Sequence, residues 1–236
     1  MSISENLARI SQQIQQFAQQ TGRDNVRLLA VSKTKPVEMI EQAIYAGQRA
    51  FGENYVQEGV EKIAYFAKTP DLEWHFIGPL QSNKTRLVAE HFDWIQTVDR
   101  LKIAERLSVQ RPVDKAPLNV LIQINISDED SKSGIAPEQM LSLAKQIYQL
   151  PHLRLRGLMA IPKPESDPQQ QKIALSKMQQ LFDRLQAEFD GIDTLSMGMS
   201  DDMQSAIECG STMVRIGTAI FGTRDYPTKN LANSAA

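Results

Sequence analysis

Eight short apolar runs, most of them separated by helix-like segments, limit what this chain can fold into more than any other feature. The runs cover residues 28–32, 49–51, 74–77, 94–98, 118–126, 153–159, 194–197 and 212–216. Strands that alternate with helices are typical of parallel β/α units, and eight such units close into a barrel. The sequence therefore predicts an α/β fold, a (β/α)8 TIM barrel.

An open, doubly wound sheet is the alternative arrangement for the same alternation. Such a sheet usually carries a glycine-rich phosphate loop after its first strand. Here the first strand ends in Ser-Lys-Thr-Lys-Pro, which contains no glycine. The barrel is therefore the favoured prediction.

An extra helix is predicted ahead of the first strand, over residues 2–21. Ser2 and Glu5 have the spacing of a capping box, and Gly22 stands where helices commonly end. Apolar residues recur every three or four positions, as on one face of a helix: Ile3, Leu7, Ile10, Ile14 and Phe17. Later helices are predicted over 36–46, 136–149, 170–189 and 200–210. We expect residues 1–226 to form one domain and residues 227–236 to be a disordered tail.

Composition and charge exclude several classes of function. Of the 236 residues, 42% are hydrophobic and 23% are charged, which is ordinary for a globular protein. The net charge of −2 predicts no basic surface for nucleic acid or anionic lipid. The sequence shows no secretion signal and no membrane span. Since Cys209 is the only cysteine and the three histidines are scattered, we expect a cytoplasmic protein without disulfides or a metal site.

Lys33 stands at the end of the first predicted strand, in the run Leu-Leu-Ala-Val-Ser-Lys-Thr-Lys-Pro. Side chains alternate between the two faces of a strand, so Lys33 shares a face with Leu29 and Val31. If that face lines the barrel, Lys33 lies at the carboxyl mouth, where barrel enzymes place their working residues. A desolvated lysine is a nucleophilic amine that can form a Schiff base with an aldehyde. Pairing with a phosphate or extension into solvent are the alternatives, and Lys35, in the turn, is expected to point to solvent.

The last predicted strand sends an arginine to the same mouth. Met213, Arg215 and Gly217 share one face of this strand, while Val214 and Ile216 suit the face that packs on helices. In a closed barrel the first and eighth strands are neighbours. The lysine of the first strand and the arginine of the eighth can therefore face one cavity.

A phosphate cradle is predicted beside these two cations. Gly217 lets backbone N–H groups approach a phosphate closely, and Thr218 and Ser200 add hydroxyl groups. Asp201 and Asp202 would repel an anion, so the main phosphate contact is expected at the glycine and the threonine. A ligand with an aldehyde, a ring nitrogen and a phosphate would meet all these groups, and pyridoxal 5′-phosphate is such a ligand.

Several long motifs, in family order, resemble the YggS/PROSC family of pyridoxal-phosphate homeostasis proteins. They include LLAVSKTKP, FGENYVQEG, WHFIGPLQSNK, LRGLMAIP and LSMGMSDDMQSAIECGSTMVRIGTAIFG. The resemblance implies the fold of the N-terminal barrel domain of alanine racemase, with Lys33 as the Schiff-base lysine and Arg215 at the pyridine nitrogen. The further contacts it implies are those lining the ring, Asn54, His75 and Met159, and those holding the phosphate, Ser200, Gly217 and Thr218. His75 suits a packing or ring-stacking role as well as an acid–base role.

The resemblance implies a protein that takes part in vitamin B6 and amino or keto acid homeostasis. Arg215 can only donate a hydrogen bond, so the pyridine nitrogen should stay unprotonated and the ring should be a poor electron sink. We therefore expect a carrier without catalytic turnover, with PLP-dependent apoenzymes as candidate acceptors. An amino-acid racemase or related weak enzyme, and an interaction protein that uses the cofactor as a signal, are the alternatives. We expect a monomer, and we expect that Lys132, after the fifth strand, could reach the cavity.

Overall fold

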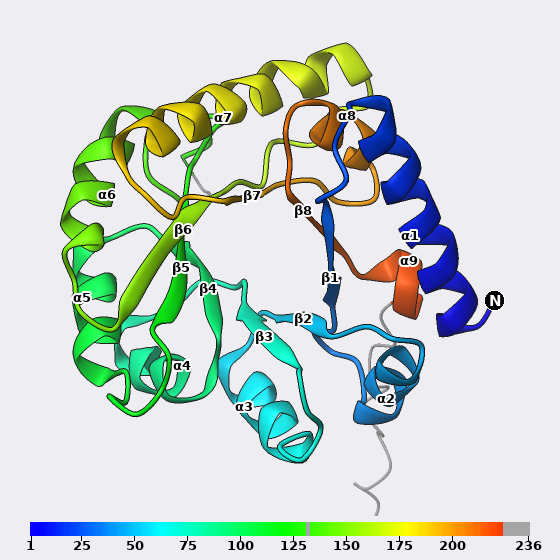
Figure 1. The fold of residues 1–236 in the computed structure, drawn as a ribbon, viewed down its shortest axis with the longest axis horizontal. Helices are drawn as coiled ribbons and strands as arrows, with labels where there is room; N and C mark the ends of the chain where they lie inside the picture. The colour runs from blue at the N-terminus through cyan, green and yellow to red at the C-terminus, as the bar shows by residue number, and fades with distance from the viewer. Residues whose placement is uncertain (131–132, 224–236) are drawn as a thin grey trace, which may run out of the picture.

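The eight predicted strands form a closed parallel barrel in chain order (Figure 1). The computed structural model describes residues 1–130 and 133–223. The strands are β1 (Arg27–Val31), β2 (Ala50–Glu53), β3 (Glu73–Phe76), β4 (Trp94–Val98), β5 (Leu118–Gln123), β6 (Leu153–Met159), β7 (Thr194–Ser196) and β8 (Met213–Ile216). Because β8 pairs with β1 as well as with β7, the barrel prediction is confirmed and the open sheet is excluded.

Helices surround the barrel and follow the strands in alternation (Figure 1). Predicted helices are found as α1 (Ile3–Gln20), α2 (Val37–Tyr45), α6 (Met140–Tyr148, preceded by the 3-10 turn η2, Pro137–Gln139), α7 (Pro168–Glu188) and α8 (Met203–Glu208). The structure adds α3 (Val56–Tyr65), η1 (Ser82–Lys84), α4 (Thr85–His91), α5 (Leu101–Gln110) and α9 (Thr218–Phe221). Because the strands are parallel, the loops that follow them all lie at one end of the barrel, the carboxyl end.

The N-terminal helix α1 completes the ring of helices. Ser2 caps its first turn, since the Ser2 side chain accepts a hydrogen bond from the Glu5 N–H at 3.1 Å. One face is buried, through Ile3, Leu7, Ile10, Ile14 and Ala18. The helix packs beside α8 and α9, and Asn6 donates to the Ile220 carbonyl at 2.9 Å. Because α9 is only four residues long, α1 supplies the cover that a longer eighth helix would give.

Two hydrophobic layers separate the inside of the barrel from its outside. Alternate residues of β1 divide between them: Leu29 packs inside with Met213, whereas Ala30 joins the core between the sheet and the helices. On β8, Val214 also belongs to that outer core. The predicted alternation is confirmed, and it directs the odd-numbered residues of β1 and β8 into the barrel.

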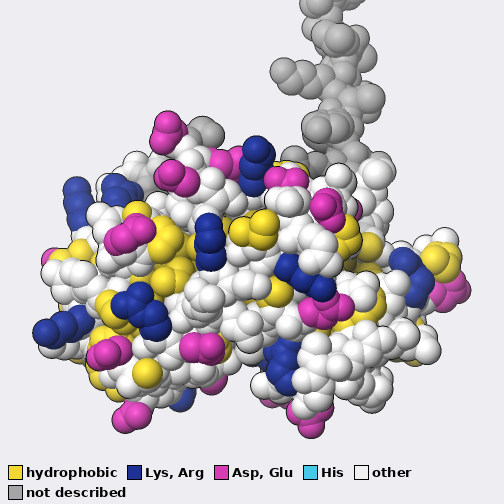
Figure 2. All heavy atoms as spheres, turned by 90° about the horizontal axis from the view of Figure 1, so that it is seen from above, with side chains coloured by type: hydrophobic (Ala, Val, Ile, Leu, Met, Phe, Trp, Pro, Cys, Tyr) yellow, Lys and Arg dark blue, Asp and Glu magenta, His cyan; other side chains and the backbone are white. Residues whose placement is uncertain are grey.

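One face of the molecule mixes charges of both signs. Figure 2 shows acidic and basic side chains interspersed over the face that it presents. Across residues 1–130 and 133–223, none of the helices is long and apolar enough to cross a membrane. Two expectations, on Lys132 and on the tail 227–236, lie outside the described residues.

Candidate functional site at the carboxyl mouth

Lys33 lies two residues beyond the end of β1, at the carboxyl mouth of the barrel. Leu29 and Val31, which share its strand face, belong to the cluster inside the barrel. Lys33 itself is half-buried. The strand thus delivers this lysine to the rim of the barrel interior, as its position in the sequence predicts.

A buried ion pair under the rim supports the loop that carries Lys33. Lys62 of α3 lies 2.7 Å from the Glu53 carboxylate, and the two side chains are only 6% and 0% exposed. Ser32 donates to Glu53 at 2.7 Å, while Lys62 donates to the Ser32 carbonyl at 2.7 Å. Thr34 takes a positive φ of 63° and donates its N–H to Glu58 at 2.5 Å. The turn around Lys33 is therefore tied to α3 on both sides of the lysine.

Lys35 is placed differently from its prediction. Its side chain is buried, and Nζ donates to the carbonyl oxygens of Gly222 and Thr223 at 3.1 and 2.8 Å. The prediction that it points to solvent is wrong, because the segment after α9 folds back over the β1 loop and offers these carbonyls. Lys35 therefore links the loop after β1 to the segment after α9.

Arg215 lies inside the barrel on β8, as predicted, and is only 4% exposed. Its Nη1 donates to the Ser196 hydroxyl at 2.6 Å, and Nη2 donates to the Ala160 carbonyl at 2.9 Å. Burial lowers the pKa of Arg215 to about 10, with the Asp202 carboxylate acting in the opposite direction. The guanidinium therefore stays protonated at neutral pH and offers donors to the mouth.

The three predicted phosphate contacts follow the last two strands. Gly217 comes directly after β8 and packs against β1: a Cβ at this position would lie 3.2 Å from the Val31 carbonyl oxygen. Thr218, the first residue of α9, and Ser200, between β7 and α8, are exposed. Asp202 folds back to accept the Met199 N–H at 2.7 Å. The two hydroxyls and the close backbone approach therefore follow the neighbouring strands β7 and β8 at the carboxyl end of the barrel.

Asn54 and Met159, predicted to line a ring, occupy two further strand ends. Met159 is fully buried in a cluster with Trp94 and Leu121. Asn54 follows β2, and Gly78 permits its close approach, since a Cβ at position 78 would lie 2.1 Å from the Asn54 carbonyl oxygen. The buried Oδ1 of Asn54 accepts no hydrogen bond from the described part of the chain.

Gln123 is a candidate that sequence reasoning missed. It ends β5, pairs in register with Met159 and is 6% exposed. Within the described residues, its buried Oε1 accepts no hydrogen bond. Leu121 lies inside the barrel, so strand alternation could have identified Gln123 as its inward neighbour. Because native proteins leave few buried polar atoms unsatisfied, this acceptor, like that of Asn54, points to a ligand at the mouth.

His75 lies deeper than the other predicted residues. It is fully buried in the barrel interior and stacks on Trp94, with ring centroids 4.9 Å apart and planes 14° from parallel. Its Nε2 lies 2.7 Å from Glu73 and its Nδ1 lies 2.9 Å from Gln96. Burial lowers the pKa of His75, and the Glu73 carboxylate opposes this effect. That His75 lines the ring of a bound ligand stays a prediction. Its packing on the ring of Trp94 is observed.

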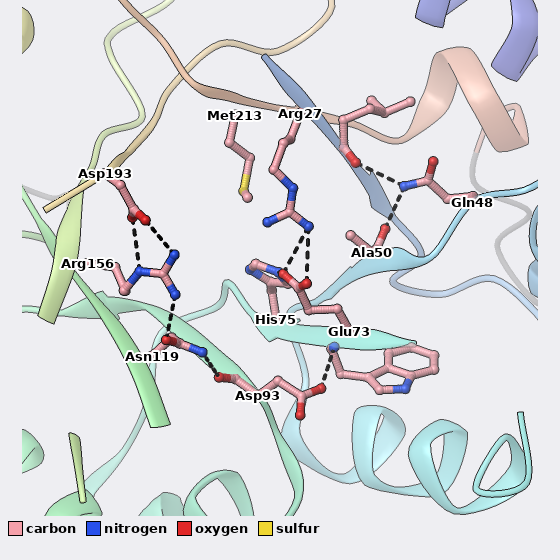
Figure 3. Close-up of polar contacts among 12 residues, drawn as sticks. Arg27, Gln48, Ala50, Glu73, His75, Asp93, Asn119, Arg156, Asp193 and Met213 are labelled. Atoms are coloured by element: carbon pink, nitrogen blue, oxygen red, sulfur yellow. Dashed lines mark hydrogen bonds and ion pairs between the residues drawn. The ribbon is translucent and has the colours of Figure 1, made fainter. Parts of the chain in front are cut away.

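The amino-terminal end of the barrel holds a second set of polar residues. Figure 3 shows Arg27 reaching Glu73, and Arg156 lying between Asp193 and Asn119. Arg156 binds Asp193 through two hydrogen bonds, of 2.9 and 2.6 Å. These side chains satisfy one another, which is typical of an end that stabilises the barrel.

A cavity of about 780 Å³ opens beside the carboxyl mouth, and its size suits a small ligand. It lies among the loops after β5, β6 and β7 and the first half of α7, with Ser127, Lys163 and Met199 in its lining. Among the described residues, no group of three or more His, Cys, Asp or Glu side chains could hold a metal ion. The cavity lining includes neither Lys33 nor Arg215. The fold is a (β/α)8 barrel, and its candidate small-molecule site lies at the carboxyl ends of the strands.

Comparison with known proteins places the chain among its relatives. The family described as alanine racemase, N-terminal domain, matches residues 6–225. The pyridoxal phosphate homeostasis protein of Pasteurella multocida is 71% identical over 231 residues, which cover 96% of this chain and 99% of that protein. The protein of the same name from Haemophilus influenzae is 66% identical, covering 97% and 98% of the two chains.

Solved structures show the same likeness. PipY of Synechococcus elongatus with PLP bound is 35% identical, with a TM-score of 0.83, and the match covers 94% of this chain and 100% of that one. Alanine racemase of Clostridium difficile, 16% identical with a TM-score of 0.71, shares the fold over 95% of this chain and 58% of its own. The chain belongs to the alanine racemase N-terminal domain family and, within it, to the family of the pyridoxal phosphate homeostasis proteins.

Proposed function

We propose that the protein binds pyridoxal 5′-phosphate at the carboxyl mouth and takes part in vitamin B6 homeostasis. One observation carries the proposal: a protonated Arg215 is buried at the end of β8, next to the Gly217 rim and to the strand that leads to Lys33. The relative PipY has been solved with PLP bound. The curated relatives named above are called pyridoxal phosphate homeostasis proteins.

The residues present fit this cofactor. When bound, PLP supplies an aldehyde that combines with amines and a pyridine ring that can accept electron density. Lys33 would provide the amine, and Arg215 would donate to the ring nitrogen. The unsatisfied acceptors of Asn54 and Gln123 lie at the carboxyl ends of β2 and β5, where a ligand at the mouth would supply the missing donors. The remaining proposed contacts are Met159 on the ring side and Ser200, Gly217 and Thr218 on the phosphate side, with the fully buried His75 below them.

A carrier role follows from the chemistry of Arg215. A guanidinium has no acceptor, so Arg215 holds the ring nitrogen unprotonated and weakens the ring as an electron sink. Lys33 can move a proton on one side of a substrate, and no second acid–base group is assigned to the other side. We therefore propose that residues 1–226 form one barrel domain that holds the cofactor and passes it on with little turnover.

The wider setting is part of the same proposal. PLP-dependent apoenzymes are the proposed acceptors of the cofactor, and the protein acts as a monomer. The single cysteine, Cys209, is buried and free, which fits the reducing cytoplasm. On the face in Figure 2 acidic and basic side chains are interspersed, so this face offers no basic patch for nucleic acid.

The proposal is tested with the purified protein and added PLP. A visible absorption band should form, borohydride should reduce it irreversibly, and the modified peptide should contain Lys33. The loaded protein should then transfer its cofactor to an apoenzyme before reduction. Absence of any band at saturating PLP would refute the proposal.

An amino-acid racemase is the second candidate, because the matching family is described as alanine racemase, N-terminal domain. The loaded protein is incubated with L-alanine in deuterated water, and deuterium at the α-carbon is measured. We expect slow or no exchange. Exchange at rates of ordinary enzymes, about 1–10³ per second, would establish an enzyme instead of a carrier.

A further inference from the structure

A line of hydrogen bonds crosses the inside of the barrel and ends on Arg215. Arg215 and Ser196 are 2.6 Å apart, Ser196 and Gln96 are 2.6 Å apart, and Gln96 and His75 are 2.9 Å apart. The line continues from His75 to Glu73, at 2.7 Å. Ser196, Gln96 and His75 are fully buried, so water does not compete for these bonds. The five residues come from β8, β7, β4 and β3.

The chemistry of the first member sets the direction of every bond in the line. An arginine only donates, so the Ser196 oxygen accepts from Arg215 and its single proton is given to Gln96 Oε1. The amide NH2 of Gln96 then faces His75 Nδ1, and it also donates to the Met213 sulfur at 3.3 Å. The sulfur contact independently supports this orientation of the amide.

The tautomer of His75 follows from that direction. Nδ1 must accept from Gln96, so the imidazole proton sits on Nε2 and is donated to Glu73. The Glu73 carboxylate is held in turn by two bonds from Arg27, at 3.1 and 3.2 Å, at the amino-terminal end (Figure 3). Donors therefore point one way from Arg215 to Glu73, an arrangement in which each bond polarises the next.

We infer that His75 is a positioning residue for Arg215: as a neutral Nε2–H imidazole it orients Gln96, which orients Ser196, which holds the guanidinium in place. The inference rests on the proposed function, since the guanidinium is the group that would meet the ring nitrogen of PLP. Ser196 and the Ala160 carbonyl grip two different nitrogens of Arg215. Two anchors fix the plane of a guanidinium, and one of them depends on the His75 tautomer.

If the hydrogen bonds in this line ran in the opposite direction, the position of Arg215 should change, although His75 does not contact it. If His75 carried its proton on Nδ1, the Gln96 amide would have to turn and present its NH2 to Ser196. The serine oxygen would then receive two donors, and its own proton would need another acceptor. The grip on Arg215 would change although no residue of the mouth had been altered.

The first experiment uses the protein without cofactor. Nitrogen-15 NMR of the imidazoles distinguishes the tautomers, and the chain has only three histidines. We expect His75 to be neutral with its proton on Nε2, and Gln96→Glu, which cannot donate to Nδ1, to change that state. A wild-type His75 that is charged or protonated on Nδ1 alone would overturn the inference whatever the protein binds.

The second experiment uses the protein loaded with PLP. Ser196→Ala and Gln96→Glu should each move the absorption maximum of the bound cofactor and weaken PLP affinity by about tenfold. Ser196→Thr keeps the hydroxyl, so its absorption maximum and PLP affinity should match those of the wild type. Such a match would show that the defect of Ser196→Ala comes from the lost hydroxyl and not from altered packing. Unchanged spectra and affinities in Ser196→Ala and Gln96→Glu would overturn the positioning role. A wild-type protein that binds no PLP would refute the proposed function and leave the NMR result standing.

Discussion

The two ends of the barrel differ in how they satisfy their polar groups. At the amino-terminal end, Arg27 pairs with Glu73, and Arg156 pairs with Asp193 and Asn119. At the carboxyl end, buried acceptors of Asn54 and Gln123 receive no hydrogen bond from the described residues. These polar groups at the amino-terminal end satisfy one another, whereas the two acceptors at the carboxyl end stay open, as the proposed ligand site requires.

The difference shows where the fold places stability and where it places binding. Carboxyl ends of barrel strands commonly carry function, and amino-terminal ends commonly carry stability. In this protein the ion pair that supports the functional end, between Glu53 and Lys62, lies outside the barrel under α3. Because this pair lies outside, it does not occupy the inside of the mouth, where Lys33 and Arg215 are found. Lys33→Ala at the carboxyl end and Arg156→Ala at the amino-terminal end should accordingly separate loss of binding from loss of stability.

The largest effect is expected from Lys33→Ala at the carboxyl end. Removal of the amine should abolish the borohydride-reducible adduct on the peptide that contains residues 30–36, because this amine is the nucleophile proposed to form it. Mass spectrometry of the reduced, digested protein measures the adduct. Lys35→Ala is the matched control, two residues away, and should keep the adduct because its side chain binds carbonyls of residues 222 and 223. An adduct found on Lys35 in the wild type would contradict the assignment.

The buried pair under the rim should give the largest loss of stability. Lys62→Met leaves the Glu53 carboxylate without its partner in a site that is 0% exposed, at a cost of about 3–5 kcal/mol in the free energy of unfolding. Urea denaturation measures this cost. The double variant Lys62→Met/Glu53→Leu should be less destabilised than Lys62→Met alone, since no unpaired charge remains. If the double variant were the less stable of the two, the pair would not be the cause.

Gly217→Val should weaken PLP binding more than Arg215→Ala does. A side chain at 217 meets Val31 within 3.3 Å and blocks several phosphate contacts together, so we expect a loss of more than about 100-fold. Loss of Arg215 removes one charged hydrogen bond to the ligand, worth about 1.5–3 kcal/mol, or about 10- to 100-fold. Equilibrium titration with PLP compares the two. The reverse order of affinities would place the main binding energy at the ring instead of the phosphate.

Arg156→Ala tests the other end of the barrel. It removes the two bonds to Asp193, the bond to Asn119 and the contact of the guanidinium with the Trp94 ring, 4.7 Å from its centroid. We expect a loss of about 1–3 kcal/mol in unfolding free energy, and PLP affinity within about twofold of wild type. Thermal denaturation and PLP titration of the same sample measure both. A tenfold loss of PLP affinity would show that the amino-terminal end also contributes to binding.

The smallest effect is a pH dependence at Glu73. Burial opposes ionisation of Glu73, but hydrogen bonds from His75 and Arg27 outweigh it and lower its pKa to about 2. A pKa lowered in the folded state stabilises the protein above the unfolded pKa of about 4.5 and ceases to do so as the pH falls through about 2. With screening of the partly exposed side chain, the contribution should be about 1–2 kcal/mol. Urea denaturation between pH 5 and 2 should show this loss in the wild type and not in Glu73→Gln.

Local patterns in the sequence were sufficient for the barrel and for much of its mouth. The eight runs became eight strands, and the alternation that put Arg215 inside was confirmed because a strand has a strict period of two. The same rule placed Lys33 on the rim. It also applied to Gln123, whose inward direction could have been inferred from Leu121. Lys35 escaped the rule, because a carbonyl from a segment almost 190 residues away decides where its side chain lies.

By itself, the sequence determined where the eight strands and five of the helices lie, which strand faces are apolar and which cations reach the carboxyl mouth. These properties depend on near neighbours along the chain, so they leave a periodic pattern. Only the tertiary structure decided that α1 closes the ring of helices and that Gln96 meets Ser196, 100 positions away. The tautomer of His75 also follows from that contact. Closure of the barrel brings such residues together across its interior, and a contact between distant residues leaves no local period in the sequence from which it could be predicted.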